Sequence, residues 1–454
     1  MASMEHIISL CKRRGFIYQG SEIYGGLAGT WDYGPYGVAL KKNIEQLWWK
    51  RFVLMRDDMY GVDASILMNQ EVWKASGHVG GFSDPLVEDL KTKKRYRADH
   101  LLEDQGVDPK GMTLATMDAA IKEKKLKSPE GNPLGDVRQF NMMFKTHVGA
   151  TEDEASVSYL RPETAGGMFV NFKNILDSFH PKMPFGLAQI GKAFRNEIAP
   201  RDFIFRVREL EQMEIEFFVH PDSWREHFDA FQKEQVTFLT EDLGLPQSKI
   251  HQVEIADVDR AHYSKWSVDT EFDFPMGQKE LLGLAYRTDY DLQSHTKASG
   301  VDLTYFNDET KERYVPHCVE PTFGLGRLML AVLSDAYTED ELGGEKRIYL
   351  KLDKKVAPVK AAVFPLLKNK PELRDRAQQI YKDLKKQIPQ IIWDDSGNIG
   401  KRYRRQDEIG TPYCITVDFE TLEGETKDTV TIRDRDTGAQ RRVSVSELVA
   451  LVSN

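Results

Sequence analysis

The sequence predicts an α+β protein in two parts, a larger region that contains a long antiparallel hairpin and a smaller C-terminal α/β domain. Two strand-like runs, residues 186–195 and 203–219, flank a short polar stretch that contains Pro200, which is typical of a hairpin. Beyond Pro358, strand-like and helix-like segments alternate over about 100 residues, the size of one compact domain.

Composition excludes several classes of protein. The chain of 454 residues has 62 Lys and Arg residues against 71 Asp and Glu residues, a formal net charge of -9. This acidity argues against nonspecific coating of nucleic acid, although it does not exclude local basic clusters. The three cysteines lie far apart without a CxxC pair, so no structural zinc or disulfide framework is expected. No window approaches the ~20 apolar residues of a membrane helix, and charges interrupt residues 1–16, so we expect no membrane span, no secretory signal and a cytoplasmic protein.

The remaining elements follow from periodicity. Before the hairpin, the sequence predicts helices over 5–14 and 38–52, an ordered glycine- and aromatic-rich loop or hairpin over 20–37, and a strand over 60–68. The Lys-rich stretch 92–133 has weak periodicity and is interpreted as an inserted subdomain. After the hairpin, the expected elements are a helix over 223–243, short strands within 252–310 taken as a second insertion, a strand over 316–323 and a helix over 324–333.

Charged side chains alternate along both strands of the predicted hairpin. Residues two apart on a strand share a face, so Arg195 and Glu197 point the same way. The facing row runs through Arg206, Arg208, Leu210, Gln212 and Glu214. Guanidinium groups beside carboxylates suit a polyphosphate at one end and an ammonium group at the other. The alternative interpretation is a solvated face with cross-strand ion pairs, each worth at most about 1 kcal/mol.

Three further stretches have residue types suited to ligand binding. Gly324 and Gly326 stand at a strand-to-helix junction that favours anions, and Arg327 in the first helical turn is unfavourable unless an anion binds there. Glu163 follows Pro162 at a predicted helix start. Residues 400–405, Gly-Lys-Arg-Tyr-Arg-Arg, suit phosphate contact with base stacking. The alternatives are a packing turn, a helix-capping glutamate and a solvated basic helix start.

Taken together and in this order, the stretches resemble the class II aminoacyl-tRNA synthetases, and specifically the dimeric form of glycyl-tRNA synthetase. The resemblance covers nearly the whole chain and rests on residues 11–16, 21–26, 31–35, 96–100, 160–163, 194–197, 211–214, 320–324 and 400–405. It implies a catalytic domain over 1–350, built on a central antiparallel sheet flanked by helices, with insertions at about 87–150 and 240–315. It also implies an anticodon-binding domain over 355–454.

The resemblance implies an ATP-dependent ligase that makes glycyl-adenylate and then transfers the glycyl group to the 3′ end of tRNA(Gly). Mg²⁺ is expected with ATP, and no metal site formed by the protein alone is assigned. Arg195 is the expected contact to the α-phosphate and Arg327 to the γ-phosphate, which makes them the catalytic candidates. The implied ATP contacts are Arg195, Asn196, Glu197, Phe205, Arg206, Val207, Arg208, Glu209, Leu210, Glu280, Leu281, Gly324, Leu325, Gly326 and Arg327.

Glycine has no side chain, so its affinity must come from its two charges and its selection from a wall beside Cα. The resemblance implies that Glu163, Glu211, Glu214 and Glu320 hold the ammonium group, with Arg97 near the carboxylate and Thr322 near Cα. Crowded carboxylates repel each other, so some of them are expected to have raised pKa values in the empty site. The full set of implied glycine contacts is Arg97, Glu163, Leu210, Glu211, Gln212, Met213, Glu214, Glu320, Pro321, Thr322, Phe323 and Gly324.

For tRNA, the resemblance implies phosphate or base contacts from Lys401, Arg402, Tyr403, Arg404 and Arg405, and an acceptor-end contact from Arg201. The Lys-rich insertion is expected near the acceptor stem. A homodimer is expected, formed through the N-terminal helix.

Two positions depart from the family pattern. Gly166 replaces a usual Gln, and Leu210 replaces a usual Phe that stacks on adenine. These departures leave open a catalytically inactive, synthetase-like nucleic-acid-binding or polymerase accessory protein. A ligase for another small amino acid is the third alternative.

Overall fold

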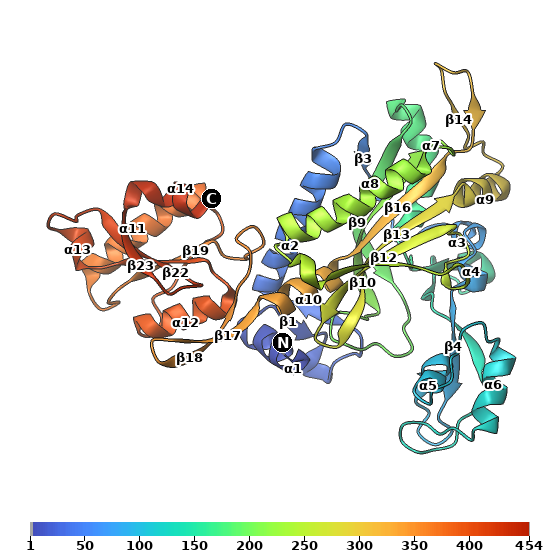
Figure 1. Cartoon of the computed structure of the whole chain (residues 1–454), viewed down its shortest axis with the longest axis horizontal. Helices are drawn as coiled ribbons and strands as arrows, with labels where there is room; N and C mark the ends of the chain where they lie inside the picture. Colours follow the sequence, from blue (N-terminus) through green and yellow to red (C-terminus); the bar gives the residue numbers. More distant parts are fainter. Residues whose placement is uncertain (1–2, 454) are drawn as a thin grey trace.

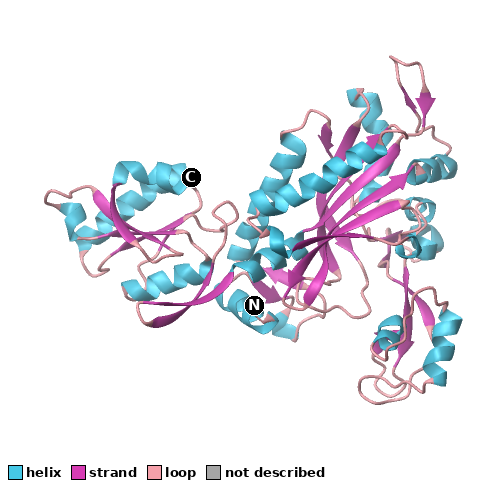
Figure 2. Cartoon of the chain, viewed as in Figure 1, coloured by secondary structure: helices cyan, strands magenta, loops and turns pink. Residues whose placement is uncertain are grey.

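The structure, a computed structural model, describes residues 3–453. A seven-stranded sheet forms its centre, in the order β11-β12-β13-β16-β10-β9-β3. Neighbouring strands are antiparallel except β3, which runs parallel to β9. The strands are β3 (Met59–Gly61), β9 (Phe185–Phe194), β10 (Glu209–Val219), β11 (Ile250–Glu254), β12 (Trp266–Phe274), β13 (Gly277–Thr288) and β16 (His317–Gly324). The predicted hairpin is confirmed as β9 and β10, and the predicted sheet flanked by helices is present (Figures 1 and 2).

The two faces of the sheet are covered differently. Odd-numbered residues of β10, such as Met213 and Phe217, pack in a core with α2 (Pro35–Trp49), α8 (Trp224–Thr237) and α10 (Leu325–Ala336). The opposite face is covered at one end by α7 (Ala165–Phe179), whose Phe169 and Phe172 pack on Phe185 and Phe218. The other end of this face lines a cavity. The N-terminal segment contains α1 (Met4–Arg14), β1 (Ile17–Gln19) and β2 (Trp31–Tyr33), and Tyr33 lines this cavity. The loop or hairpin expected over 20–37 is a hairpin, in which β1 lies before that range and pairs with β2.

The inserted subdomain forms a separate unit (Figure 1). It has a three-stranded sheet in the order β5-β4-β6 and a small core around Val87, Leu102 and Ile121. Its elements are β4 (Ser83–Glu88), β5 (Arg95–Arg97), α5 (Ala98–Glu103), α6 (Leu114–Glu123) and β6 (Arg138–Asn141). The chain enters it through α3 (Gln70–Ala75) and α4 (His78–Gly81) and leaves towards the hairpin of β7 (Lys145–His147) and β8 (Val157–Tyr159).

The prediction of a second insertion over about 240–315 is wrong for most of that range. Strands β11, β12 and β13 belong to the central sheet, where β13 pairs with β16. The elements of this range outside that sheet include α9 (Tyr290–Ser299), the hairpin of β14 (Tyr305–Phe306) and β15 (Arg313–Tyr314), and two short 3-10 helices, Gln247–Lys249 and Asp257–Asp259. Pairing between β13 and β16 joins segments distant in sequence, and local periodicity carries no information about such partners.

A second α/β unit follows the hairpin of β17 (Tyr337–Leu342) and β18 (Glu345–Leu350). Its five-stranded sheet has the order β20-β19-β21-β22-β23. The elements are β19 (Ala361–Pro365), α11 (Pro371–Gln387), β20 (Ile391–Trp393), α12 (Ile399–Ile409), β21 (Tyr413–Val417), α13 (Phe419–Leu422), β22 (Thr429–Asp434), β23 (Gln440–Ser444) and α14 (Leu448–Ser453). Among the residues described, no helix combines the length and the apolar character that crossing a membrane requires.

Candidate active site

Strands β10 and β16 carry polar residues on the face opposite the large core. Glu214 on β10 lies directly across from Thr322 on β16, and Gln212 lies across from Gly324. Side chains alternate along a strand, so Gln212, Glu214 and Glu216 share this face with Glu320 and Thr322. The Thr322 hydroxyl lies 3.0 Å from a carboxylate oxygen of Glu214 and 3.0 Å from one of Glu320.

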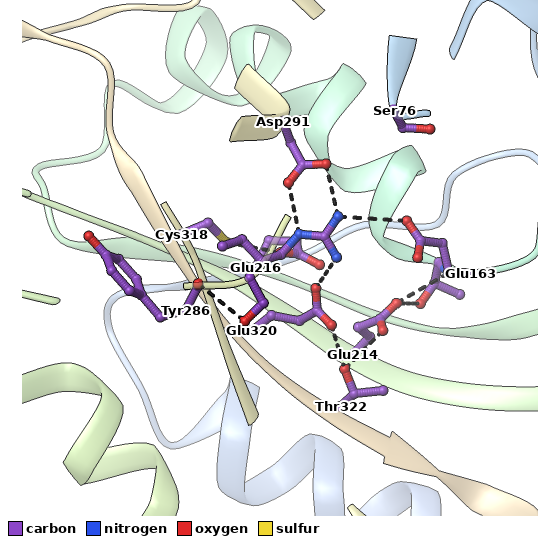
Figure 3. Close-up of polar contacts among 12 residues, drawn as sticks. Ser76, Glu163, Glu214, Glu216, Tyr286, Asp291, Cys318, Glu320 and Thr322 are labelled. Atoms are coloured by element: carbon purple, nitrogen blue, oxygen red, sulfur yellow. Dashed lines mark hydrogen bonds and ion pairs between the residues drawn. The ribbon is translucent and has the colours of Figure 1, made fainter. Parts of the chain in front are cut away.

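An arginine lies in the middle of these acids. Arg287 on β13 is 1% exposed and its guanidinium contacts Asp291 at 2.8 and 2.9 Å. It also hydrogen bonds to Glu320, and its Nη2 lies 4.0 Å from Oε1 of Glu163. Figure 3 shows the labelled Asp291, Glu320 and Glu163 converging on one guanidinium. We call Glu163, Glu214, Glu320 and Asp291, together with Arg287, the acid cluster.

Glu163 reaches the cluster from the loop before α7. The helix begins at Ala165 with Thr164 as its N-cap, and no side-chain cap is formed, so Glu163 does not cap this helix. Its Oε2 lies 3.2 Å from Nε2 of His78. Glu214 instead accepts hydrogen bonds from the backbone N–H of Thr164, at 3.2 Å, and from the Thr164 hydroxyl. The helix-capping interpretation of Glu163 is therefore wrong.

The acids differ in how readily they ionise. Burial raises the pKa of Glu320 to about 8; Glu214 and Glu163 add to this effect, while Arg287 opposes it. Burial and the nearby charge of Glu163 raise the pKa of Glu214 as well. Burial also disfavours ionisation of Glu163, but His78, Arg287 and Arg195 lower its pKa to about 2. The expectation that some of these acids have raised pKa values is therefore confirmed, for Glu320 and Glu214.

Three buried acceptor atoms on this sheet face have no hydrogen-bond donor among the residues described. One is Oε1 of Glu216, and the two nearer the cavity are Oε1 of Glu163 and Oε1 of Gln212. Unpaired buried acceptors are costly, and a buried acceptor without a donor indicates a missing partner. A small cation with several N–H groups would satisfy these oxygens and the excess negative charge at once.

A cavity of about 460 Å³ adjoins the acid cluster along the same sheet face. Its lining includes Gln212 and Thr322, which contact Glu214, and the sequence-predicted Arg195 and Arg327. The other predicted residues that line it are Arg201, Glu197, Phe205, Arg206, Val207, Glu209, Leu210, Glu211, Glu280, Leu281, Gly324 and Gly326. The guanidinium groups and the acids expected at one site therefore do lie together.

Arginines along this cavity are held by neighbouring oxygens. Nε of Arg195 donates to the backbone oxygen of Pro162 at 3.0 Å, and Nε of Arg206 donates to Glu197 at 2.8 Å. Nη1 of Arg327 lies 3.0 Å from Glu280, whose pKa it lowers, so a carboxylate supplies the anion expected near this helix start. The guanidinium of Arg327 also stacks on Phe205, with 4.4 Å from its carbon to the ring centroid.

The tip of the β9–β10 hairpin is packed against the core. Phe203 is buried and meets the Trp31 ring edge-on, with centroids 4.7 Å apart. The backbone oxygen of Ile204 would lie 2.9 Å from a Cβ at Gly326, so a glycine is required there. This contact explains Gly326 by packing as well as by any role towards an anion.

Several predicted contacts lie on the wrong face of the sheet. Met213 pairs with Phe323 across β10 and β16, and both are fully buried in the large core. Pro321 shares that face by alternation, and Leu325 is buried in the same core. Glu211 also turns away from the acid cluster and forms an ion pair with Lys41 of α2 at 2.5 Å, although it touches the cavity rim.

Two arginines predicted to touch substrate have structural partners instead. Arg97 lies in β5 of the inserted subdomain, where it pairs with Asp84 at 2.7 Å and Asp99 at 2.5 Å. Arg208 donates to the backbone oxygens of Glu197 and Ala28, and it does not line the cavity. Asn196 contacts the inserted subdomain through its backbone N–H, which donates to Met142.

The basic segment of the C-terminal domain is helix α12, and only part of it faces outwards. Arg402 is 1% exposed and donates to three backbone oxygens, so it stabilises the domain. Tyr403 packs against Phe364 and hydrogen bonds to Thr416. The burial of Arg402 contradicts its predicted contact with tRNA, whereas the predicted role of the partly exposed Tyr403 stays a prediction. Arg404 and Arg405 pair with Glu345 and Asp394, whereas Lys401 is exposed.

Sequence reasoning missed Arg287, Asp291 and His78. A pair spaced by four residues, Arg287 and Asp291, is a usual helix-surface pattern, so it gave no sign of burial.

The structure also shows the surroundings of the two residues that depart from the family pattern. Leu210 lines the cavity, and Gly166 lies against Trp73, whose ring would be 2.8 Å from a Cβ at that position.

Comparison with known proteins agrees with this geometry. The family model described as tRNA synthetase class II core domain (G, H, P, S and T) matches residues 144–336, and an anticodon binding domain model matches 360–454. The glycine–tRNA ligase of Deinococcus radiodurans is 48% identical over 99% of this chain and 98% of its own. Those of Caldanaerobacter subterraneus and Clostridium tetani are each 50% identical, over 98% and 99% of this chain and 97% and 98% of theirs. The sheet, the acid cluster and these matches agree, and the chain belongs to the glycine–tRNA ligase family of class II aminoacyl-tRNA synthetases.

Proposed function

We propose that this protein is an ATP-dependent glycine–tRNA ligase. The acid cluster carries the proposal: buried carboxylates with raised pKa values and unpaired acceptors lie beside a cavity lined by arginines. An amino acid places its ammonium group among the acids and its carboxylate towards the arginines. The full-length similarity to ligases named for glycine supports that choice of amino acid.

Glycine is selected by size in this proposal. The space around Thr322 is bounded by the carboxylates of Glu214 and Glu320, each 3.0 Å from the hydroxyl. An amino acid larger than glycine would place its side chain against these groups and leave buried charges without partners. Such an amino acid should therefore bind much more weakly than glycine. The ammonium group then satisfies Glu163, Glu214 and Glu320, which are the proposed glycine ligands.

ATP occupies the cavity of about 460 Å³ in this proposal. Arg195 binds the α-phosphate and offsets the charge that develops there when the glycine carboxylate attacks. Glu197, Arg206 and Arg327 contact the rest of the nucleotide. The substrate in this proposal is the magnesium complex of ATP, and the Glu280 carboxylate beside Arg327 would be the oxygen ligand that this site could offer the metal, which would offset phosphate charge. No protein base is needed, because the nucleophile is already ionised, and the rate enhancement comes from positioning and charge.

The second step transfers glycine to the 3′ end of tRNA(Gly). The C-terminal domain, with the exposed Lys401, is proposed to bind the anticodon arm, and Arg201 at the hairpin tip the acceptor end. A homodimer and a cytoplasmic location are part of the same proposal, by analogy with the family. An inactive synthetase-like protein is disfavoured, because a cluster of buried acids costs stability when it has no ligand to bind.

The deciding experiment is amino-acid-dependent exchange of pyrophosphate into ATP, with glycine, alanine and serine compared. We expect exchange with glycine and at least about 100-fold less with the other two, because their side chains meet buried polar groups. Transfer of glycine to tRNA is measured on the same preparation. Exchange with none of the three amino acids would support the binding-protein alternative, and exchange with alanine or serine a different ligase.

A further inference from the structure

The entry to the inserted subdomain passes directly beside the acid cluster. We call residues 76–82, between α3 and β4, the neck. His78 in the neck is 5% exposed and lies between the rings of Trp73 and Phe82, at centroid distances of 5.6 and 5.5 Å. Its Nε2 lies 3.2 Å from Oε2 of Glu163, and its Nδ1 lies 2.8 Å from the hydroxyl of Ser76.

Both ring nitrogens of His78 therefore have a partner, and the partners determine which nitrogen bears the hydrogen. A carboxylate only accepts hydrogen bonds, so in the neutral ring Nε2 donates to Glu163. Nδ1 then accepts from the Ser76 hydroxyl, which is itself buried. Ser76 thus favours the imidazole tautomer with its hydrogen on Nε2, which is the tautomer that donates to Glu163.

This contact uses only one oxygen of the Glu163 carboxylate. The other oxygen, Oε1, is buried without a hydrogen-bond donor and lies 4.0 Å from Nη2 of Arg287. The carboxylate is thus hydrogen bonded at one oxygen, whereas the other has only the longer ion-pair contact with Arg287; we call this second oxygen the free oxygen because it accepts no hydrogen bond. The free oxygen belongs to the acid cluster, where the proposed function places the ammonium group.

The neck also touches the arginine at the other end of the site. The guanidinium of Arg195 lies over the Phe82 ring, 5.5 Å from its centroid. The chain that leaves the subdomain adds a second link, because the backbone of Met142 donates to Phe82 and accepts from Asn196 at 2.7 Å. One short segment therefore contacts both the acid that faces the ammonium group and the arginine that faces the phosphate.

We propose that His78, oriented by Ser76, is a positioning residue that fixes Glu163 so that its free oxygen receives the ammonium group of the amino acid. This inference rests on the proposed function and extends it to residues that touch no substrate. The ammonium group remains unchanged during adenylate formation. The contact with Glu163 therefore stabilises the bound amino acid and the transition state equally. Loss of such uniform binding raises KM and leaves kcat unchanged.

The test compares His78→Leu, His78→Gln and Ser76→Ala in glycine-dependent pyrophosphate exchange on the full-length protein. The matched control is His317→Leu, which removes a partly buried imidazole bonded to Tyr286 at the far end of β16. For His78→Leu we expect glycine KM to rise roughly 10- to 100-fold, the loss typical of a hydrogen bond to a charged group, with kcat and ATP KM within about 3-fold. His78→Gln retains an N–H donor and should recover most of the affinity.

Three results would overturn the proposal: equal KM for the Leu and Gln variants, an equal rise in the control, or a rise in ATP KM that matches that of glycine. Melting curves show whether each variant folds. If His78→Leu is unfolded, Ser76→Ala decides, because it keeps the ring and should still raise glycine KM several-fold. If the wild type shows no exchange, the ligase proposal fails separately. Calorimetric binding of glycine to the same variants then tests the positioning role, and undetectable or unchanged binding rejects it.

Discussion

At the residue scale, the acid cluster holds more negative charge than Arg287 neutralises. Glu163 is ionised, Asp291 pairs with Arg287, and Glu320 has a pKa of about 8 because it is buried. The protein tolerates this arrangement because Glu320 and Glu214 can keep protons while the site is empty. An incoming cation replaces those protons, so binding of the cation is linked to proton release.

Replacing Glu320 by glutamine tests this role. The amide mimics the protonated acid, so the melting temperature should change little, while glycine KM in the exchange assay rises about 100-fold from loss of a charged contact. Glu339→Gln, at an exposed position on β17, is the control. A normal glycine KM in Glu320→Gln would mean that the ammonium group binds elsewhere.

The raised pKa of Glu320 determines the direction in which glycine KM and stability change with pH. Glu320 has a raised pKa, so its ionised form, which binds the ammonium group, becomes dominant only above about pH 8. Glycine KM should therefore fall as pH rises from about 6 to 8.5, roughly tenfold per unit where one proton is released on binding. Stability without glycine changes in the opposite direction. The unfolded chain ionises this residue near its ordinary pKa of about 4.3, so stability falls as pH rises from there to about 8.

Exchange kinetics at each pH measure the first effect, and melting with and without glycine measures the second. Glu320→Gln should flatten both profiles. A glycine KM that is constant across this range would contradict the assignment of the proton to Glu320.

The family resemblance located some of this chemistry. It implied that Glu163, Glu214, Glu320 and Thr322 act together, and the structure brings them together. Arg287 was missed because nothing local distinguishes a buried arginine from an exposed one. Its partner Glu320 is distant in sequence and becomes a neighbour through pairing of β13 with β16, and Glu163 reaches it from the loop before α7.

At the element scale, strand alternation corrects the predicted glycine site. Glu211 and Glu214 are three apart on β10, so their side chains must face opposite ways. The prediction followed the family pattern and did not apply this rule to Glu211. The same rule separates Thr322 from Phe323, so alternation could have divided the predicted residues into two faces from the sequence alone.

A pair of substitutions on β10 tests the two faces. Glu211→Gln removes a partner of Lys41 behind the sheet and should cost about 1 kcal/mol of unfolding free energy, with glycine KM within about 3-fold of wild type. Glu214→Gln lies in the acid cluster and should raise glycine KM at least about 10-fold. Denaturant unfolding and the exchange assay measure both variants, and similar KM values in the two would refute the assignment of faces.

The Leu210 position tests how the cavity holds the base. Leu210 lines the cavity, but an aromatic ring, Phe205, already lies there under Arg327. A base stacked on an aromatic side chain gains about 1–3 kcal/mol, so Leu210→Phe should lower ATP KM by at least about 5-fold. Leu210→Met is the control for size. An unchanged ATP KM in Leu210→Phe would show that Leu210 does not face the adenine.

At the scale of the whole molecule, a buried ion-pair network joins the two domains. Arg347 on β18 pairs with Asp340 at 2.8 Å and with Asp407 on α12 at 3.4 Å. Asp407 also forms two bonds with Arg433, at 2.7 and 3.0 Å. The sequence indicated a domain boundary near residue 356, but it gave no sign of this network, because its members come from separate elements that meet only in the folded chain.

Breaking this network should separate the two steps of the proposed reaction. Asp407→Asn leaves two buried arginines without their shared anion, which costs about 3–5 kcal/mol locally. The acid cluster and the cavity lie in the other domain, so glycine-dependent exchange should remain within about 2-fold of wild type, since groups without shared contacts act independently. Charging of tRNA requires the two domains to be held in the correct relative position. Its rate should fall at least about 10-fold, because misplaced reactants react more slowly. Asp428→Asn, which breaks an exposed pair with Arg376, is the matched control. If exchange and charging fall in parallel, the network supports the catalytic domain itself and not the placement of the second domain.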